Sequence, residues 1–187
     1  MKKIVAATNN KGKLEEIKSI IKNCEILSLK DVNCNIEVKE DGKTFEENSK
    51  KKAKEISEYI NMPCIADDSG LCIDIYDGWP GVYTARFLGE DTTARQRNEY
   101  ILHKMKDLKG EERNAKVKCC ITYYEDGRCI TQLGEIKGKI SNKCRGNNGF
   151  GFDEIFELDD GRTLAELSKE EKNRISARKI ALSKIEI

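Results

Sequence analysis

The order of strand and helix patterns at the start of the chain constrains the fold most. The apolar run 4–7 predicts a buried strand, the polar stretch 8–12 predicts a turn, and 14–21 predict a helix with one apolar face. Residues 25–29 predict a second strand. Because two strands connected through a helix usually pair in parallel, the opening predicts a β-α-β unit and an α/β fold.

The middle of the chain predicts a helix followed by a strand that ends in acidic residues. Thr44 is a suitable N-cap for a helix over 44–60. Residues 64–66 predict a short strand with Asp67-Asp68-Ser69-Gly70 at its C-terminal end. The alternation of apolar and polar residues over 71–75 then predicts a further, half-buried strand.

The second half of the chain predicts a helix, a hairpin and a last helix. Helical spacing covers 92–108, and two alternating segments over 115–123 and 129–140 predict a hairpin that forms a second lobe. Ser168 opens a capping box, which predicts a final helix with Ile175 facing inward.

The composition limits the classes of function. The length of 187 residues predicts a single domain over 1–187. Since 34 Lys and Arg balance 33 Asp and Glu, there is no overall basic field, and nucleic acid is not expected as a partner. No apolar run is long enough to cross a membrane and the first residues lack a secretory pattern, so we expect a cytoplasmic protein without membrane contact.

The cysteines and the single histidine restrict the chemistry. The eight cysteines form no C-x-x-C pair, so we expect reduced, buried side chains rather than a zinc site or a disulfide framework. His103 is the only histidine, which argues against histidine triads and multi-histidine metal sites. Any catalysis should therefore depend on carboxylates and cations.

The turn after the first predicted strand has the composition of a phosphate-binding loop. Backbone N–H groups at a helix N-terminus attract anions, and Lys13 adds a full positive charge. An Asn-rich turn also commonly does no more than end a strand, and this segment alone leaves both interpretations open. The loop consists of Thr8, Asn9, Asn10, Lys11, Gly12 and Lys13.

Asp67 and Asp68 suggest a metal site. Two adjacent carboxylates beside a buried strand repel each other unless a cation or a proton lies near them. Because neighbouring side chains of a strand point to opposite faces, only one of the pair should share a metal with a carboxylate such as Glu40 or Glu47. The alternative is a surface turn with no metal.

The segment Phe150-Gly151-Phe152-Asp153 places two aromatic rings beside a carboxylate. One interpretation is stacking of a nucleobase, worth about 1–3 kcal/mol per base. Core packing of either ring is the other. Lys172 and Arg178 lie near the last predicted helix, where they either reach a base or phosphates or keep the helix solvated.

Six short motifs, in order along almost the whole chain, resemble the inosine triphosphate pyrophosphatase family. The resemblance implies an α/β fold with an elongated central mixed β-sheet flanked by helices, two lobes with an active-site cleft between them, and a homodimer. It implies Mg²⁺-dependent hydrolysis of ITP, dITP and XTP to the monophosphate and pyrophosphate, which clears deaminated purines from the nucleotide pool. The motifs cover 8–13, 44–49 with 52–53, 66–71, 81–86, 149–153 and 176–178.

The resemblance also implies roles for particular residues. Asp68 would be the base toward the attacking water and a metal ligand, with Glu40 as the second metal ligand and Asp67 and Glu47 as outer carboxylates. The loop 8–13, with Lys52, would hold the phosphates, and Ser69 would touch the substrate. The residues expected at the base are Phe150, Gly151, Phe152, Asp153, Lys172, Ala177 and Arg178.

The sequence departs from the family pattern at two positions near the base residues. Ala177 stands where the family has histidine, and Glu154 stands where proline is usual, which we expect to loosen that loop. Both changes bear on base selectivity. Two other functions therefore stay open: a related pyrophosphatase for modified pyrimidine or methylated nucleotides, and a nucleotide-binding module without catalysis.

Overall fold

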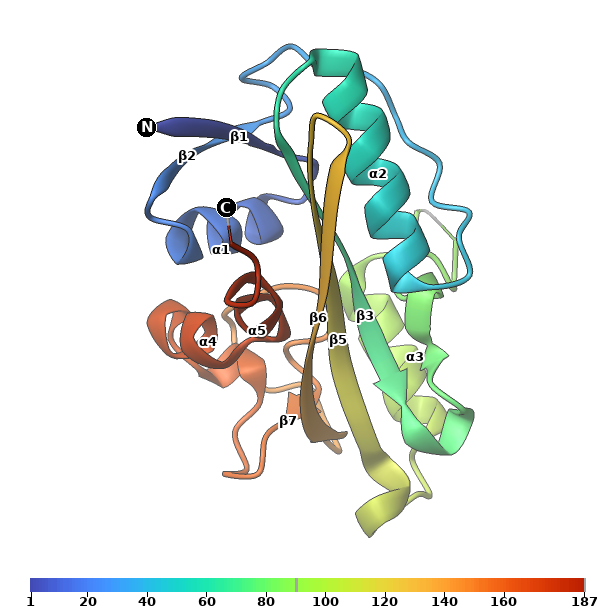
Figure 1. Ribbon diagram of the computed structural model, residues 1–187. Helices are drawn as coiled ribbons and strands as arrows, with labels where there is room; N and C mark the ends of the chain where they lie inside the picture. The colour runs from blue at the N-terminus through green and yellow to red at the C-terminus, as the bar shows by residue number, and fades with distance from the viewer. Residues whose placement is uncertain (90, 187) are drawn as a thin grey trace. The chain divides into compact units, whose positions relative to one another are not determined.

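The computed structural model describes residues 1–89 and 91–186 and shows a mixed α/β fold (Figure 1). The strands are β1 Lys2–Ala6, β2 Cys24–Ser28, β3 Cys64–Ile73, β4 Trp79–Pro80, β5 Asn114–Glu125, β6 Arg128–Ile140 and β7 Phe156–Glu157. The α-helices are α1 Lys11–Ile20, α2 Phe45–Ile60, α3 Ala94–Lys104, α4 Lys169–Ile175 and α5 Ala177–Leu182. The predicted fold class is confirmed.

The strands form one mixed sheet in the order β2-β1-β3-β5-β6-β7, with β4 paired to β3. Strand β1 pairs in parallel with both β2 and β3, which confirms the predicted β-α-β unit. The pairs β3–β4 and β6–β7 are antiparallel. The sheet therefore contains both parallel and antiparallel pairs.

The chain divides into two compact units, each built from separate stretches of sequence. Unit 1 comprises Met1–Asp68, Cys119–Gly134 and Ala177–Ile187, and unit 2 comprises Ser69–Lys118 and Glu135–Ser176. The hairpin was predicted to form the second lobe, and this is wrong because its turn-side half belongs to unit 1. The single domain over 1–187 and the cleft stay predictions.

Helix α2 of unit 1 begins and ends where the sequence predicts. The Thr44 side chain accepts a hydrogen bond from the Glu47 N–H, and Asn61 ends the helix in the left-handed conformation. Ala53 and Ile56 on its inner face join the core of unit 1, to which β1 contributes Val5. Burial of this apolar face, rather than helix propensity alone, stabilises the helix.

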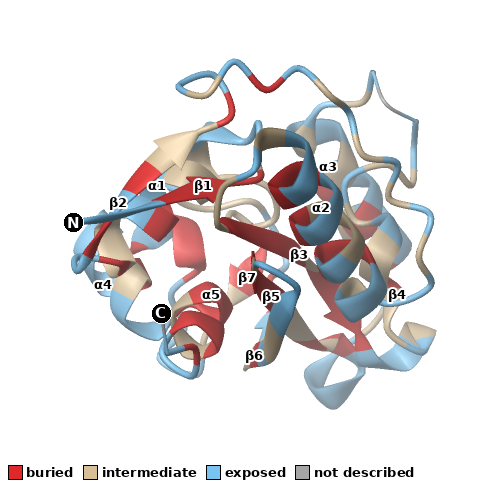
Figure 2. Cartoon of the chain, turned by 45° about the horizontal axis from the view of Figure 1, so that its top comes forward, coloured by how far each residue is buried: buried red, intermediate tan, exposed pale blue. Residues whose placement is uncertain are grey.

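Strand β3 is one ten-residue strand, not two short ones. Every residue except Ser69 is buried, and the strand is red in Figure 2. The prediction placed Asp67-Asp68-Ser69-Gly70 at a strand end because polar residues usually mark a turn. They instead lie in mid-strand, since β3 has a neighbour on each side to complete its hydrogen bonding.

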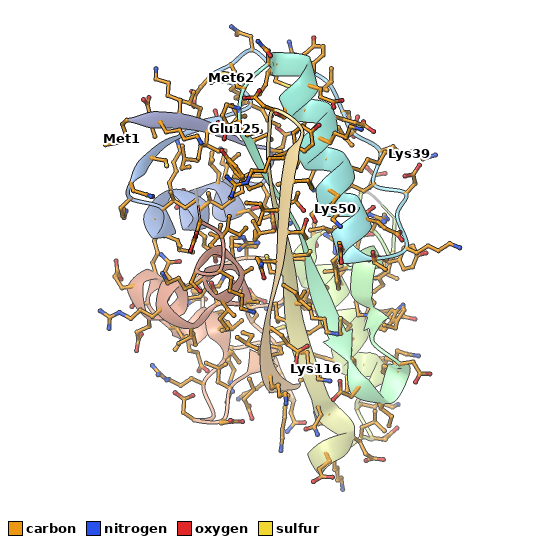
Figure 3. The ribbon with its side chains drawn as sticks, in the orientation of Figure 1. Met1, Lys39, Lys50, Met62, Lys116 and Glu125 are labelled. Atoms are coloured by element: carbon orange, nitrogen blue, oxygen red, sulfur yellow. The ribbon has the colours of Figure 1, made fainter. Side chains whose placement is uncertain are left out.

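The β5–β6 hairpin turns at Asp126-Gly127, as predicted. Both residues have positive φ, 47° and 84°, which is the signature of a type I′ turn. Across the strands the Thr122 and Thr131 hydroxyl groups lie 3.0 Å apart. Figure 3 labels Glu125, the last residue of β5, beside this turn.

The predicted last helix is two helices, because Ser176 has extended backbone with ψ at 150°. The Ser168 capping box is confirmed. The inward placement of Ile175 is wrong, since this side chain is 39% exposed at the end of α4. The break between α4 and α5 coincides with the boundary between the units, so that Lys172 belongs to unit 2 and Arg178 belongs to unit 1.

The cysteines follow the expectation of reduced side chains, all eight being free thiols. Cys129 is exposed and Cys144 is half-buried, whereas the other six are buried. Among the described residues, no helix combines the length and the apolar character that a membrane span requires.

Gly134 allows α5 to pass close to β6 within unit 1. A Cβ atom at this position would lie 1.9 Å from the Ala177 carbonyl oxygen. We therefore expect Gly134→Ala to lower the free energy of unfolding by about 1–3 kcal/mol, because backbone must move to admit the methyl group. Urea unfolding measures this, with Leu133→Ala at the exposed neighbouring position as the control. Equal stability of Gly134→Ala and the wild type would contradict the close approach.

Candidate active site

Asp67 is a buried carboxylate surrounded by cations. The Lys13 ammonium lies 3.1 Å from its Oδ2, and the Arg178 guanidinium donates to the same oxygen at 2.8 Å. Burial alone would raise the pKa of Asp67, but Lys13, Arg178 and Lys52 outweigh it and hold the pKa well below its usual range. Asp67 therefore carries a fixed negative charge at physiological pH.

Asp68, the next residue of β3, has different surroundings. Its Oδ2 accepts a hydrogen bond of 2.8 Å from the Asn48 side-chain amide. Burial raises the pKa of Asp68, and the negative charge of Glu40 adds to the effect, against the opposing influence of Asn48 and two lysines. Since this carboxylate has no direct ion pair among the described residues, it is the more basic of the two.

Glu40 lies in the loop before α2. Lys52 of α2 forms an ion pair with Glu40, and Lys51 forms one with Asp41 at 2.7 Å. Figure 3 labels Lys39 in this loop, which runs beside the helix that carries Lys50. Although burial opposes the charged form of Lys52, the carboxylates of Asp67, Glu40 and Asp68 raise its pKa. Lys52 is therefore a cation among three acids.

The carboxylates of Asp68 and Glu40 fit a magnesium site. Among the described residues no group of three or more His, Cys, Asp or Glu side chains could hold a metal. Mg²⁺ bound with a nucleotide, however, usually takes one or two carboxylates and completes its shell with phosphates and water. The mutual repulsion of Asp68 and Glu40 is what a divalent cation would offset.

The loop 8–13 forms the N-terminus of α1. The Asn10 side chain accepts a hydrogen bond from the Lys13 N–H at 3.1 Å, and the Thr8 hydroxyl accepts one from the Asn10 N–H at 3.1 Å. Asn9, Asn10 and Lys11 are exposed, while Thr8, Gly12 and Lys13 are half-buried. A ten-residue helix thus begins at an accessible, Asn-rich loop, as an anion site requires.

In unit 2, Asp153 organises the aromatic segment. Its Oδ2 accepts a hydrogen bond of 2.8 Å from the Phe150 N–H and pairs with the Lys172 ammonium, which lies 4.2 Å from the centroid of the Phe150 ring. Phe152 instead stacks on Phe87, with 6.4 Å between the ring centroids. Core packing is thus confirmed for Phe152, whereas stacking of a nucleobase on Phe150 stays a prediction.

The segment around Asp153 is held by close packing at Gly149 and by contacts with helix α3. A Cβ atom at Gly149 would lie 2.0 Å from Asp153 Oδ2, and Gly149 has φ of 77°. Glu154 pairs with Arg95 of α3 at 3.2 Å. Asn98 of the same helix donates to the Gly151 carbonyl group at 3.1 Å. These contacts oppose the loosening that we expected from Glu154.

The remaining predicted residues lie as follows. Ala177 is buried at the start of α5, and Arg178 also pairs with Glu16 of α1. Ser69 is the half-buried residue of β3. Glu47 accepts from the Lys43 N–H at the start of α2.

Three neighbours of the aspartates were not among the predicted site residues. They are Asn48 beside Asp68, Glu16 beside Arg178, and Cys119, whose thiol lies 3.8 Å from Asp67. Burial raises the pKa of Cys119 to about 12, so it remains a thiol. Only Asn48 had a signal in the sequence, because it lies one turn before Lys52 on the predicted helix.

The chain belongs to the Ham1 family, whose sequence model matches residues 4–186. The solved structure of the Staphylococcus aureus Ham1 protein is similar, with a TM-score of 0.86 and 35% identity over 97% of this chain and 95% of that chain.

Relatives with an activity in their names are also similar over nearly the full length. The dITP/XTP pyrophosphatase of Clostridium perfringens is 44% identical over 99% of this chain and 96% of that relative. The dITP/XTP pyrophosphatase of Geobacter sulfurreducens is 43% identical over 98% of this chain and 94% of that relative.

We expect Asp67→Asn to lower the free energy of unfolding at pH 7 by about 3–5 kcal/mol, because it removes the buried charge that Lys13 and Arg178 share. The folded pKa of Asp67 lies below its ordinary value of 3.8, so the stability from this charge is complete above that pH. It is lost as the pH falls toward the folded pKa. The difference between variant and wild type should therefore shrink on acidification.

Urea unfolding at pH 7, 5 and 3 measures this difference. Asp41→Asn is the control, since Asp41 is exposed and its ion pair with Lys51 lies at the surface. A stability difference between Asp67→Asn and wild type that is unchanged from pH 7 to pH 3 would contradict the structural role of the Asp67 charge.

Proposed function

We propose that this chain is a dITP/XTP pyrophosphatase that also accepts ITP and releases the monophosphate and pyrophosphate. Near full-length similarity to relatives of that name supports the activity. The observation that carries the mechanism is the contrast between two adjacent buried carboxylates: Asp67 is paired with cations, whereas Asp68 has no ion pair among the residues that the structure describes.

Asp68 is the base that takes a proton from the attacking water. A general base needs an oxygen that is available to the attacking water, and Asp68 has no ion pair with a described residue that would occupy its carboxylate. Asp67 is unsuited to the role because its cations hold its pKa low. The proton from water therefore moves to the Asp68 carboxylate as the new oxygen–phosphorus bond forms at the α-phosphate and the bond to the departing pyrophosphate breaks.

Cations of unit 1 hold the triphosphate. Transfer of a phosphoryl group needs positioning and neutralisation of charge more than covalent help from the protein. Lys13 and Lys52 supply positive charge, and Thr8, Asn10 and the N-terminus of α1 supply hydrogen-bonding groups. When a triphosphate binds, these lysines exchange part of their contact with Asp67 and Glu40 for phosphate oxygens.

Asp68 and Glu40 hold Mg²⁺ in this proposal. When bound there, the ion would neutralise charge on the phosphates. The protein residues fix the direction of attack and exclude other nucleophiles. Asp68 and Glu40 would supply two carboxylates, which is the number that Mg²⁺ bound with a nucleotide usually takes from a protein.

The nucleobase of the substrate is recognised by groups that donate hydrogen bonds. Hypoxanthine and xanthine carry an oxo group where adenine carries an amine, so a cationic donor such as Lys172 of unit 2 favours them. Arg178 of unit 1 is instead held by ion pairs with Glu16 and Asp67. The Phe150 ring, beside Lys172 in unit 2, offers a stacking surface. We further propose that the protein is a cytoplasmic homodimer, as the family resemblance suggests.

A panel of triphosphates tests the substrate class. We expect the kcat/KM values of dITP, XTP and ITP to exceed those of dUTP, UTP and methylated nucleotides by at least about 100-fold, because the single ring of uracil loses stacking surface and an added methyl group blocks hydrogen bonds at the edge of the nucleobase. Pyrophosphate release measures the rates. Faster turnover of a pyrimidine or methylated nucleotide would support the related pyrophosphatase instead, and no turnover at all would support a binding module.

Asp68→Asn tests the base. We expect kcat to fall by about 100-fold or more, since general base catalysis contributes about 10²–10⁴. The fold should persist, because asparagine keeps an acceptor for Asn48 and removes a disfavoured buried charge. Kinetics and thermal unfolding measure the two effects. Near-normal kcat would remove Asp68 from the role of base.

Removal of divalent metal tests the Mg²⁺ proposal. We expect EDTA to abolish pyrophosphate release from dITP and added Mg²⁺ to restore it, because Asp68 and Glu40 would otherwise face the phosphates as uncompensated negative charges. Circular dichroism before and after EDTA serves as the control for folding. Full activity in EDTA would rule out the metal.

A further inference from the structure

Asn48 is a fully buried polar residue that contacts the proposed base. It lies in the first turn of α2 with 0% of its surface exposed. Its side chain bridges two parts of unit 1: the amide donates to Asp68 Oδ2 at 2.8 Å, and its Oδ1 accepts from the Gly42 N–H at 2.7 Å. Both hydrogen bonds lie within the normal range.

The direction of these hydrogen bonds follows from the chemistry of the partners. The Gly42 N–H can only donate, so it faces the oxygen of the Asn48 amide. The nitrogen of the amide therefore faces Asp68, where it fixes one carboxylate oxygen, Oδ2. The structure shows no hydrogen bond from another described residue to Asp68 Oδ1. The Asn48 contact thus selects which oxygen of Asp68 is left for a ligand.

The same amide fixes the loop that carries Glu40. Gly42 approaches α2 so closely that a Cβ atom would lie 2.6 Å from Asn48 Oδ1 and 2.8 Å from Glu47 Cβ. Glu40 lies two residues before Gly42, and it pairs with Lys52, one helical turn after Asn48. The face of α2 that carries Asn48 and Lys52 therefore holds the loop at two points.

We propose that Asn48 is a positioning residue that sets the geometry of Asp68 and Glu40 together, an inference that rests on the proposed function of these two carboxylates. It holds Asp68 directly, and it holds Glu40 through the backbone of Gly42. A buried amide suits this task because it donates to one site and accepts from the other without adding charge. The two carboxylates come from segments 28 residues apart in the sequence, so their alignment requires such a link.

Asn48→Leu and Asn48→Ala test the proposal. Leucine keeps the branched shape of asparagine with bulkier methyl groups and removes both hydrogen bonds, and alanine serves if leucine does not fold. Ser49→Ala is the matched control, because Ser49 is also buried in α2 but bonds to the Glu46 carbonyl group and Thr122. Each variant is assayed for dITP turnover, for its Mg²⁺ requirement, and for binding of Mn²⁺ alone by calorimetry.

We expect the Asn48 variants to reduce kcat about 10- to 100-fold and to weaken Mn²⁺ binding about 10-fold, as for loss of a hydrogen bond to a charged group. The KM for dITP should change less than about threefold. Ser49→Ala should keep the wild-type Mn²⁺ affinity even where its stability falls. Mn²⁺ affinity and kcat at wild-type values in a folded Asn48 variant would overturn the proposal.

A double-mutant cycle separates positioning from general damage. If Asn48 acts through Asp68, the effect of Asn48→Ala on Mn²⁺ binding should largely vanish when Asp68→Asn is already present. Full additivity would overturn the proposal. Failure of the proposed function has a different signature: the wild type would then not hydrolyse dITP, or Asp68→Asn would leave turnover intact.

Discussion

The burial of two consecutive carboxylates in the middle of β3 is the constraint on which the rest of unit 1 depends. An uncompensated buried charge costs several kcal/mol, so each carboxylate must be stabilised by its own neighbours. On one face of the strand, Asp67 is compensated by Lys13 and Arg178. On the other, Asp68 receives one neutral hydrogen bond from Asn48 and retains a raised pKa. The alternation of a β-strand thus separates the ion-paired carboxylate of Asp67 from the carboxylate that we propose as the general base.

The ion pairs on the side of β3 that carries Asp67 also connect segments that are distant in the sequence. Lys13 and Glu16 belong to α1 and Arg178 belongs to α5, so the ion pairs of Asp67 and Arg178 connect β3 with two helices that are far apart in sequence. The lysine proposed to bind phosphate is therefore ordered by the protein before a nucleotide arrives. Such preorganisation reduces the conformational entropy lost on binding.

Much of the fold could be predicted from local patterns, because helices and strands leave a periodic signal. The type I′ turn at Asp126-Gly127, the N-cap Thr44 and the capping box at Ser168 each depend on residues close in sequence. The length of β3 could not be predicted, since polar residues in mid-strand look like a turn until its neighbours on both sides are known. The helix break at Ser176 likewise lacks a proline or glycine signal.

Part of the candidate site could likewise be predicted from the sequence, and part depends on tertiary contacts. Asp67 and Asp68 were found as a pair and expected to differ, but the identity of the more basic one depends on Lys13, Arg178 and Asn48, which arrive through tertiary contacts. Glu16 and Cys119 gave no local signal because their partners lie more than 50 residues away. The family motifs supplied the roles that periodicity could not.

The most direct test of the different roles of Asp67 and Asp68 is a crystal structure of the wild-type protein with Mn²⁺ and the α,β-methylene analogue of dITP. Anomalous scattering locates the metal without ambiguity. The account predicts Mn²⁺ on the carboxylates of Asp68 and Glu40 and on phosphate oxygens, with Asp67 still paired to Arg178. A metal bound by Asp67, or a polyphosphate remote from Asp68, would contradict it.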